Sequence, residues 1–93
     1  MANAIITFEI MPESPEMDIE AIKVKALEIV KNAGAKGEMQ SKIEPVAFGL
    51  KKILIYAMFE VSDNKDFDAI SDEIAGIEGV GNAKVANMDL AMG

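Results

Sequence analysis

The chain has 93 residues and a formal net charge of −7 at pH 7. Its length suits one domain with a single core and leaves no room for a deep cleft between lobes. It contains no cysteine and no histidine, which excludes disulfides and thiolate metal sites and removes the usual groups for proton transfer near neutrality. An enzyme is therefore not expected, and neither a metal nor a cofactor is. The negative charge disfavours direct nucleic-acid binding and permits a basic protein partner.

No segment of the sequence is typical of membrane insertion or secretion. The longest near-apolar run, Ile53 to Phe59, is too short to span a bilayer, and the N-terminus lacks the basic start and cleavage site of a signal peptide. We therefore expect a cytoplasmic protein with no membrane association.

The first predicted element is a strand over residues 4–10. Apolar side chains at Ile6, Phe8 and Ile10 alternate with polar ones, as in a strand with one buried face. The segment Met11–Glu16 contains two prolines, which cannot donate to a ladder, and we expect it to end the strand.

A helix is predicted next. Asp18 can cap it, Glu20 suits the first turn, and Met17 and Ile22 occupy the positions of a hydrophobic staple. Gly34 is the expected stop. The apolar stripe recurs at spacings of three and four, at Ile19, Ile22, Ala26, Ile29, Val30 and Ala33.

The centre of the chain predicts two strands joined by a turn. Residues 37–46 alternate weakly and suit an exposed edge strand that ends at Pro45. Phe48 and Gly49 are expected to turn the chain. From Leu50 to Val61 the sequence has the strongest β signal of the chain, which predicts a central strand.

The C-terminal third predicts a helix and a poor strand. Residues 62–64, Ser-Asp-Asn, offer N-caps, and Gly76 interrupts the helix. Its apolar face is Phe67, Ile70, Ile74 and Ile77. Residues 79–82 are predicted as a turn and 83–88 as a strand, whereas the tail 89–93 has no clear state of its own.

This order of elements predicts a ferredoxin-like α+β sandwich: a four-stranded antiparallel βαββαβ sheet with two helices on one face. Alternation along the central strand then places Leu54, Tyr56 and Met58 on the open face. These side chains form either a partner surface or a strip shielded by its long neighbours.

The charged clusters have ordinary structural explanations. Glu13, Glu16, Asp18 and Glu20 could bind a cation, but carboxylates are favoured at a helix N-terminus and their spacing matches no calcium loop. The acidic residues Asp63, Asp66, Asp68, Asp72 and Glu73 suit the solvent face of the second helix. Lys51 and Lys52 could contact an anion or guard the strand against edge pairing.

Two other functions that use this fold are not supported. The segment Ala47–Leu50 lacks the preceding basic residue and following aromatics of an RNA-recognition signature. An acylphosphatase-like enzyme needs an arginine in its phosphate loop, and this chain has no arginine. Phe48 itself could be a core residue that closes one end of the sandwich.

Three segments together resemble the archaeal elongation factor 1-beta family: Met11-Pro12-Glu13-Ser14-Pro15 followed by Asp18-Ile19-Glu20, then Pro45-Val46-Ala47-Phe48-Gly49-Leu50, then Gly76-Ile77-Glu78-Gly79-Val80. The central segment is the specific one. The resemblance covers essentially all 93 residues and implies one guanine nucleotide exchange domain, residues 1–93. It also implies a partner, the GTPase elongation factor 1-alpha, and an activity in translation elongation that needs no nucleophile, base or metal.

The resemblance also implies where the partner binds. The family's equivalent of Phe48 presses on the GTPase, as an apolar anchor entering a pocket does at many interfaces. We expect the partner-binding residues to be Phe48 with Pro45, Ala47, Gly49, Lys51, Lys52, Met88 and Leu90.

The chain departs from eukaryotic relatives, in which a lysine near the C-terminus reaches toward the magnesium site. No basic residue follows Lys84. Our hypothesis is that Phe48 and its loop displace nucleotide-binding segments of the partner, with the tail 88–93 as a steric wedge. The alternative function is a small ligand-binding or regulatory homodimer that buries Leu54, Tyr56 and Met58 between two sheets, whereas an exchange factor is expected to be a monomer when free.

Overall fold

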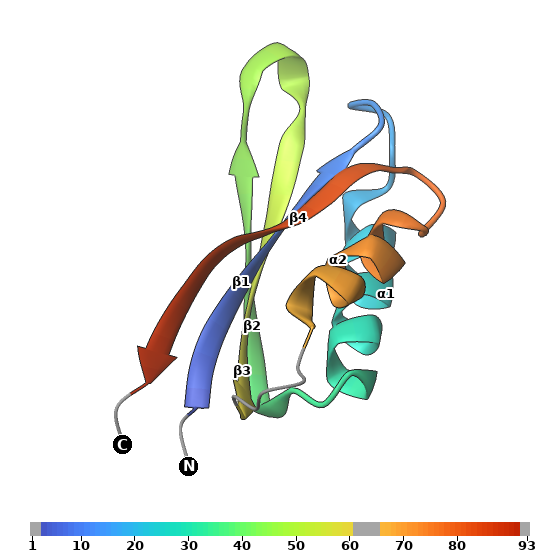
Figure 1. Ribbon diagram of the computed structural model, residues 1–93. Helices are drawn as coiled ribbons and strands as arrows, with labels where there is room; N and C mark the ends of the chain where they lie inside the picture. The colour runs from blue at the N-terminus through green and yellow to red at the C-terminus, as the bar shows by residue number, and fades with distance from the viewer. Residues whose placement is uncertain (1–2, 61–65, 92–93) are drawn as a thin grey trace.

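The computed structural model describes residues 3–60 and 66–91. In chain order the elements are β1 (Asn3–Pro12), α1 (Ile19–Asn32), β2 (Lys36–Pro45), the 3-10 turn η1 (Ala47–Gly49), β3 (Lys51–Glu60), α2 (Phe67–Ala75) and β4 (Val80–Ala91). The strands form an antiparallel sheet in the order β2-β3-β1-β4, and both helices lie on one of its faces (Figure 1). The predicted ferredoxin-like α+β fold is confirmed.

The core lies between the helices and the two inner strands, β1 and β3. Every second residue of these strands is buried, and the buried residues face the helices: Ala4, Ile6, Phe8, Ile10, Ile53, Ile55, Ala57 and Phe59. The Phe59 ring meets Phe8 and Phe67 edge to face, with centroids 6.3 and 5.2 Å apart. The predicted central strand and its inward face are therefore confirmed, and Leu54, Tyr56 and Met58 lie half-buried on the opposite face.

Helix α1 follows its sequence signals closely. The Asp18 side chain accepts a hydrogen bond from the backbone N–H of Ala21 at 3.2 Å, which caps the helix. Ile22, Ala26 and Val30 are buried, and the other members of the predicted stripe are half-buried. The helix ends at Asn32, two residues before Gly34, which has a φ of 115°.

Helix α2 is shorter. Asp66 caps it by accepting from the backbone N–H of Ala69 at 3.2 Å, and Gly76 follows its last residue. The predicted caps at 62–64 lie outside the described residues. Ile77, predicted on the helical face, comes after the helix and is half-buried.

Three predicted boundaries are wrong, all along the contact of β1 with β4. β1 continues through Met11 to Pro12, β4 begins at Val80 where a turn over 79–82 was predicted, and β4 extends to Ala91 through the tail that had no predicted state. Pairing explains all three, because Pro12 lies opposite Val80 and Asn3 lies opposite Ala91. A partner strand supplies hydrogen bonds that override weak local propensity, and Pro12 is tolerated because the pairing with β4 is irregular between Met11 and Pro12.

The molecule is elongated, with principal extents of 42 × 21 × 18 Å. The β2–β3 hairpin accounts for part of this length, because it projects beyond the rest of the sheet (Figure 1). Within residues 3–60 and 66–91, neither helix has the length and apolar character needed to cross a membrane.

Candidate functional site

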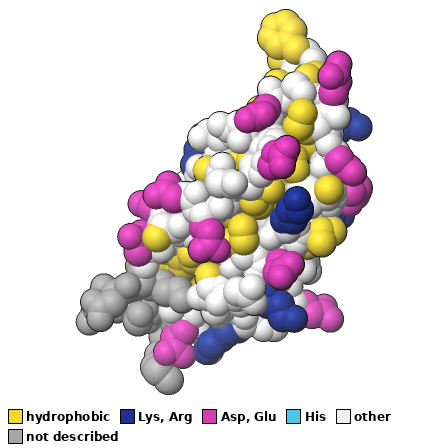
Figure 2. Space-filling model, turned by 90° about the vertical axis from the view of Figure 1, so that its right-hand side faces the viewer, with side chains coloured by type: hydrophobic (Ala, Val, Ile, Leu, Met, Phe, Trp, Pro, Cys, Tyr) yellow, Lys and Arg dark blue, Asp and Glu magenta, His cyan; other side chains and the backbone are white. Residues whose placement is uncertain are grey.

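The apex of the β2–β3 hairpin presents a fully exposed aromatic side chain. Phe48 is 94% exposed, and Figure 2 shows an apolar side chain standing clear of the surface at the hairpin end of the molecule. The apex itself is held by two backbone hydrogen bonds, from Val46 N–H to the Leu50 carbonyl at 2.7 Å and from Leu50 N–H to the Ala47 carbonyl at 3.3 Å. The turn predicted at Phe48 and Gly49 is confirmed, and Phe48 is not a core residue.

Phe48 is unfavourable in this position in two respects. Its φ of 63° and ψ of 28° are left-handed, which costs a residue other than glycine about 1–2 kcal/mol. Its ring also remains in water, although burying a phenylalanine side chain is worth about 1.5–3 kcal/mol. Strained, exposed apolar residues on a rigid turn are typical of binding sites, so the apex is the candidate contact surface.

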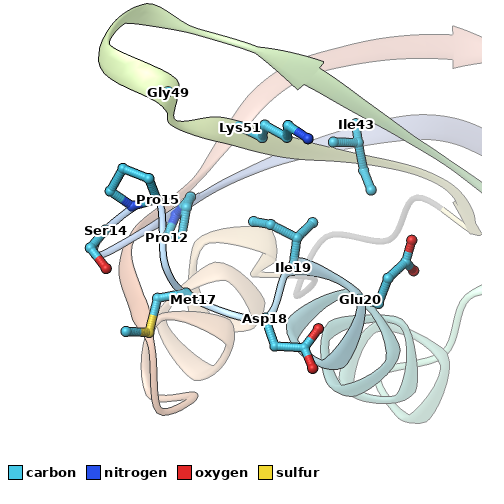
Figure 3. Close-up of a pocket in the computed structure, with 10 residues that line it drawn as sticks. All are labelled: Pro12, Ser14, Pro15, Met17, Asp18, Ile19, Glu20, Ile43, Gly49 and Lys51. Atoms are coloured by element: carbon cyan, nitrogen blue, oxygen red, sulfur yellow. The ribbon is translucent and has the colours of Figure 1, made fainter.

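A cavity of about 430 Å³ lies beside this apex, between the hairpin and the start of α1 (Figure 3). Ile43, Gly49 and Lys51 line it from the hairpin side. The connection from β1 to α1 and the first helical residues line it from the other side, with Pro12, Ser14, Pro15, Met17, Asp18, Ile19 and Glu20. The hairpin and the connection come close at one point, where a Cβ placed on Gly49 would lie 3.8 Å from the Pro15 Cβ.

The expected partner-binding residues lie in three separate parts of the structure. Pro45, Ala47, Phe48, Gly49 and Lys51 gather at the hairpin apex, and all five are exposed. The structure separates the other three from this group.

Lys52 lies on the open face of the sheet, because neighbouring strand residues point to opposite sides. Its ammonium is 3.7 Å from Glu9 and 3.7 Å from Glu44. Lys51, in contrast, is exposed and forms no ion pair with any of residues 3–60 or 66–91. The two adjacent lysines therefore have different surroundings, and only Lys51 borders the cavity.

Lys52 belongs to a row of alternating charges that crosses all four strands, which we call the ion-pair row: Glu44 on β2, Lys52 on β3, Glu9 on β1 and Lys84 on β4. Glu9 is also 3.7 Å from Lys84. At the β2 end, Glu44 pairs with Lys42 at 3.0 Å. Their hydrogen bond and mutual attraction lower the pKa of the Glu44 carboxyl and raise the pKa of Lys42. The row links the end of the hairpin next to the turn with β1 and β4.

Met88 and Leu90 lie at the opposite end of the sheet. They pair with Ile6 and Ala4 of β1, whereas the hairpin continues past the pairing of Ile10 with Ile53. The six residue-to-residue steps from Ala4 to Ile10 alone span about 20 Å at 3.3 Å per step. Both side chains are nonetheless exposed, Met88 at 48% and Leu90 at 66%.

The acidic clusters lie where solvent-exposed groups were expected. Glu13, Glu16, Asp18 and Glu20 are all exposed, and Glu20 pairs with Lys23 at 2.9 Å. The acidic residues 66, 68, 72 and 73 are exposed on α2, whereas Asp63 lies outside the described residues. Within the described ranges, no three acidic side chains come together as a metal site would require.

Sequence reasoning missed the cavity, because its two walls are more than twenty residues apart in the chain. Periodicity and capping signals describe each wall separately and carry no information on their distance. The only available signal was the resemblance of both Met11–Pro15 and Pro45–Leu50 to segments of one family, which marked the two walls without showing that they meet.

Comparison with known proteins identifies relatives along almost the whole chain. The EF-1 guanine nucleotide exchange domain family matches residues 5–91. Elongation factor 1-beta of Methanosphaerula palustris is 33% identical over 91 residues, which cover 97% of this chain and 99% of the relative. Elongation factor 1-beta of Methanothermobacter thermautotrophicus is 35% identical over 91 residues, covering 95% and 96%. The protein of the same name from Nanoarchaeum equitans is 36% identical over 78 residues, covering 83% and 91%.

Proposed function

Because the chain belongs to the elongation factor 1-beta family and carries its guanine nucleotide exchange domain, we propose that it promotes GDP release from elongation factor 1-alpha in the cytoplasm. Residues 1–93 act as one exchange domain in this proposal. No bond is made or broken, because an exchange factor needs only a higher affinity for the nucleotide-free state of the GTPase than for its GDP-bound state.

The exposed Phe48 is the observation that carries the proposal. Its backbone conformation and the two hydrogen bonds across the turn fix the direction in which the side chain leaves the apex before any partner arrives. Aromatic anchors that enter a pocket supply much of the affinity at protein interfaces. If Phe48 displaces nucleotide-binding segments of the GTPase, binding of this chain and binding of GDP oppose each other.

The surrounding contact consists of Pro45, Ala47 and Gly49, which share the apex with Phe48, whereas Lys51 borders the cavity beside it. Lys52 is better explained as the central cation of the ion-pair row. A contact through Met88 and Leu90, including the steric wedge of the tail, requires a partner that also reaches the far end of the sheet. Leu90→Ala tests that second contact separately.

Release of a fluorescent GDP analogue from elongation factor 1-alpha of the same organism tests the proposal. Catalytic amounts of the wild-type chain should accelerate release. Phe48→Ala should lower the acceleration by at least tenfold, since truncating an interface anchor costs about 2–4 kcal/mol. The matched control is Val24→Ala, which truncates another apolar side chain, 60% exposed, on the outer surface of α1.

Acceleration by Phe48→Ala equal to that of wild type would remove Phe48 from the mechanism. If the wild-type chain gave no acceleration at all, the exchange function itself would be rejected.

The alternative homodimer would use the open face of the sheet. A second cavity of about 370 Å³ lies there, bordered by Ile5, Tyr56 and Met58 among others. Leu54, Tyr56 and Met58 are already half-buried by their neighbours, which favours shielding within one chain. Light scattering of the free protein distinguishes the two functions, because the exchange factor is expected to have the mass of one chain and the alternative that of two.

A further inference from the structure

The cavity beside the hairpin apex combines apolar walls with an uneven distribution of charge. Ile19 of α1 and Ile43 of β2 point toward one another across it (Figure 3). Both acidic side chains come from the helix side: the Glu20 carboxylate points toward the hairpin and the Asp18 carboxylate points away from it, whereas the ammonium of Lys51 lies on the hairpin side (Figure 3). An occupant that fits both features needs an apolar stem and a charged end.

The sign of that charged end follows from the surroundings of the cavity. Its lining includes two carboxylates and one ammonium, and the exposed Glu13 and Glu16 lie in the same connection from β1 to α1. The whole chain carries a net charge of −7. Both local and long-range fields therefore attract a cation and repel an anion.

The two carboxylates can accept an additional partner. Asp18 uses one oxygen to cap α1, through Oδ1, and its Oδ2 makes no hydrogen bond with any of residues 3–60 or 66–91. Glu20 is exposed and pairs with the half-buried Lys23, and an ion pair with one solvent-exposed partner contributes little and leaves the second carboxylate oxygen open to another cation.

We propose that the cavity receives a lysine or arginine side chain of the GTPase, with its aliphatic stem against Ile19 and Ile43 and its cationic head at Glu20. Long basic side chains bind in this way when an apolar wall ends at an acidic rim. The inference rests on the proposed function and deepens it. Because Gly49 borders the cavity and follows Phe48 directly, the basic side chain and the Phe48 pocket would belong to one continuous surface of the partner.

The test is the affinity for nucleotide-free elongation factor 1-alpha at several salt concentrations. Glu20→Gln removes one negative charge with little change of shape, and Glu28→Gln is the matched control on the same helix outside the cavity. We expect Glu20→Gln to weaken binding by about three- to tenfold at low salt and to reduce its salt dependence. Glu28→Gln should change the affinity by less than about twofold.

Lys51→Met should change the affinity for the GTPase in the direction opposite to Glu20→Gln. With a cationic occupant, removal of the Lys51 charge should strengthen binding by about two- to threefold. Equal effects of Glu20→Gln and Glu28→Gln would overturn the inference. Weaker binding of Lys51→Met together with unchanged binding of Glu20→Gln would also overturn it and would indicate an acidic occupant.

These outcomes separate the inference from the proposed function. If wild type accelerates GDP release and Glu20→Gln binds as wild type does, only the cavity assignment fails. If wild type neither binds the GTPase nor accelerates release, both proposals fail.

Discussion

Gly79 provides a quantitative test of how the connection from β1 to α1 is held in place. Its φ is +95°, and its carbonyl accepts a hydrogen bond from the Glu13 N–H at 2.8 Å. A Cβ added there would lie 3.0 Å from the Met17 sulfur and 3.5 Å from Ile22 Cδ1. The two members of the predicted hydrophobic staple therefore both pack against this position, and a methyl group there would press on the Met17 sulfur.

Gly79→Ala should destabilise the fold in two ways, through the left-handed backbone of an alanine and through crowding of its methyl group. Gly37→Ala has only the backbone cost. Gly37 has a φ of +67°, and a Cβ there would have no heavy atom within 4 Å. A left-handed alanine destabilises the folded state by about 1–2 kcal/mol. Alanine also lowers the conformational entropy of the unfolded chain, which stabilises the fold by about 0.4–1 kcal/mol, so Gly37→Ala should lower the free energy of unfolding by about 1 kcal/mol. Crowding adds about 1–3 kcal/mol at Gly79, which gives a total of about 2–4 kcal/mol.

Urea denaturation of the two variants measures these free energies of unfolding. For a domain of this size, 1 kcal/mol corresponds to about 4–8 °C in melting temperature, so Gly79→Ala should melt at least about 10 °C below wild type. In a double-mutant cycle, Met17→Ala should cost less in the Gly79→Ala background than in wild type, because there it also removes the closest atom. A Gly79→Ala variant no less stable than Gly37→Ala would refute this explanation.

Three further predictions concern the charged groups. Lys52→Met should lower the free energy of unfolding by about 0–1 kcal/mol, less in 1 M salt, as denaturation at two ionic strengths would show; a loss of several kcal/mol would contradict it. The pKa of Glu44 is below its ordinary value of 4.5, so its pair with Lys42 should add fully to the free energy of unfolding above pH 4.5 and lose this contribution as the pH falls through the lowered pKa. An NMR titration of the Glu44 carboxyl with a midpoint of 4.5 or higher would disprove this. Asp66→Ala should cost about 1 kcal/mol in thermal unfolding through loss of the α2 cap, and an unchanged melting temperature would exclude that role.

Local signals predicted the elements that depend on local chemistry. The uninterrupted apolar and branched residues of 53–59 predicted β3 and its buried side, and Asp18 predicted the start of α1. Pro12 and the strand over 89–91 could not be predicted, because their state depends on pairing between the two ends of the chain. In these places tertiary contacts outweigh propensity.

In the candidate site, too, some features follow from local sequence and others from tertiary contacts. The bend at Phe48 could be predicted from Pro45 and Gly49, whereas the exposure of the ring was implied only by the family resemblance, since an aromatic residue is more often buried. The different surroundings of Lys51 and Lys52 follow from simple strand alternation once β3 is placed. The acidic wall of the cavity required the three-dimensional arrangement, because no sequence pattern reports the distance between α1 and the hairpin.

The ion-pair row also affects how the hairpin forms. Glu44 faces Lys52 across the two strands. A slip of β2 by two residues keeps every side chain on its proper face, so hydrophobic burial alone would not reject it, but in one direction it places Lys42 opposite Lys52. That repulsion penalises the misaligned hairpin during folding. Since the misaligned hairpin would also have a different residue at its apex, the charges next to the turn disfavour one of the pairings that would remove Phe48 from the apex.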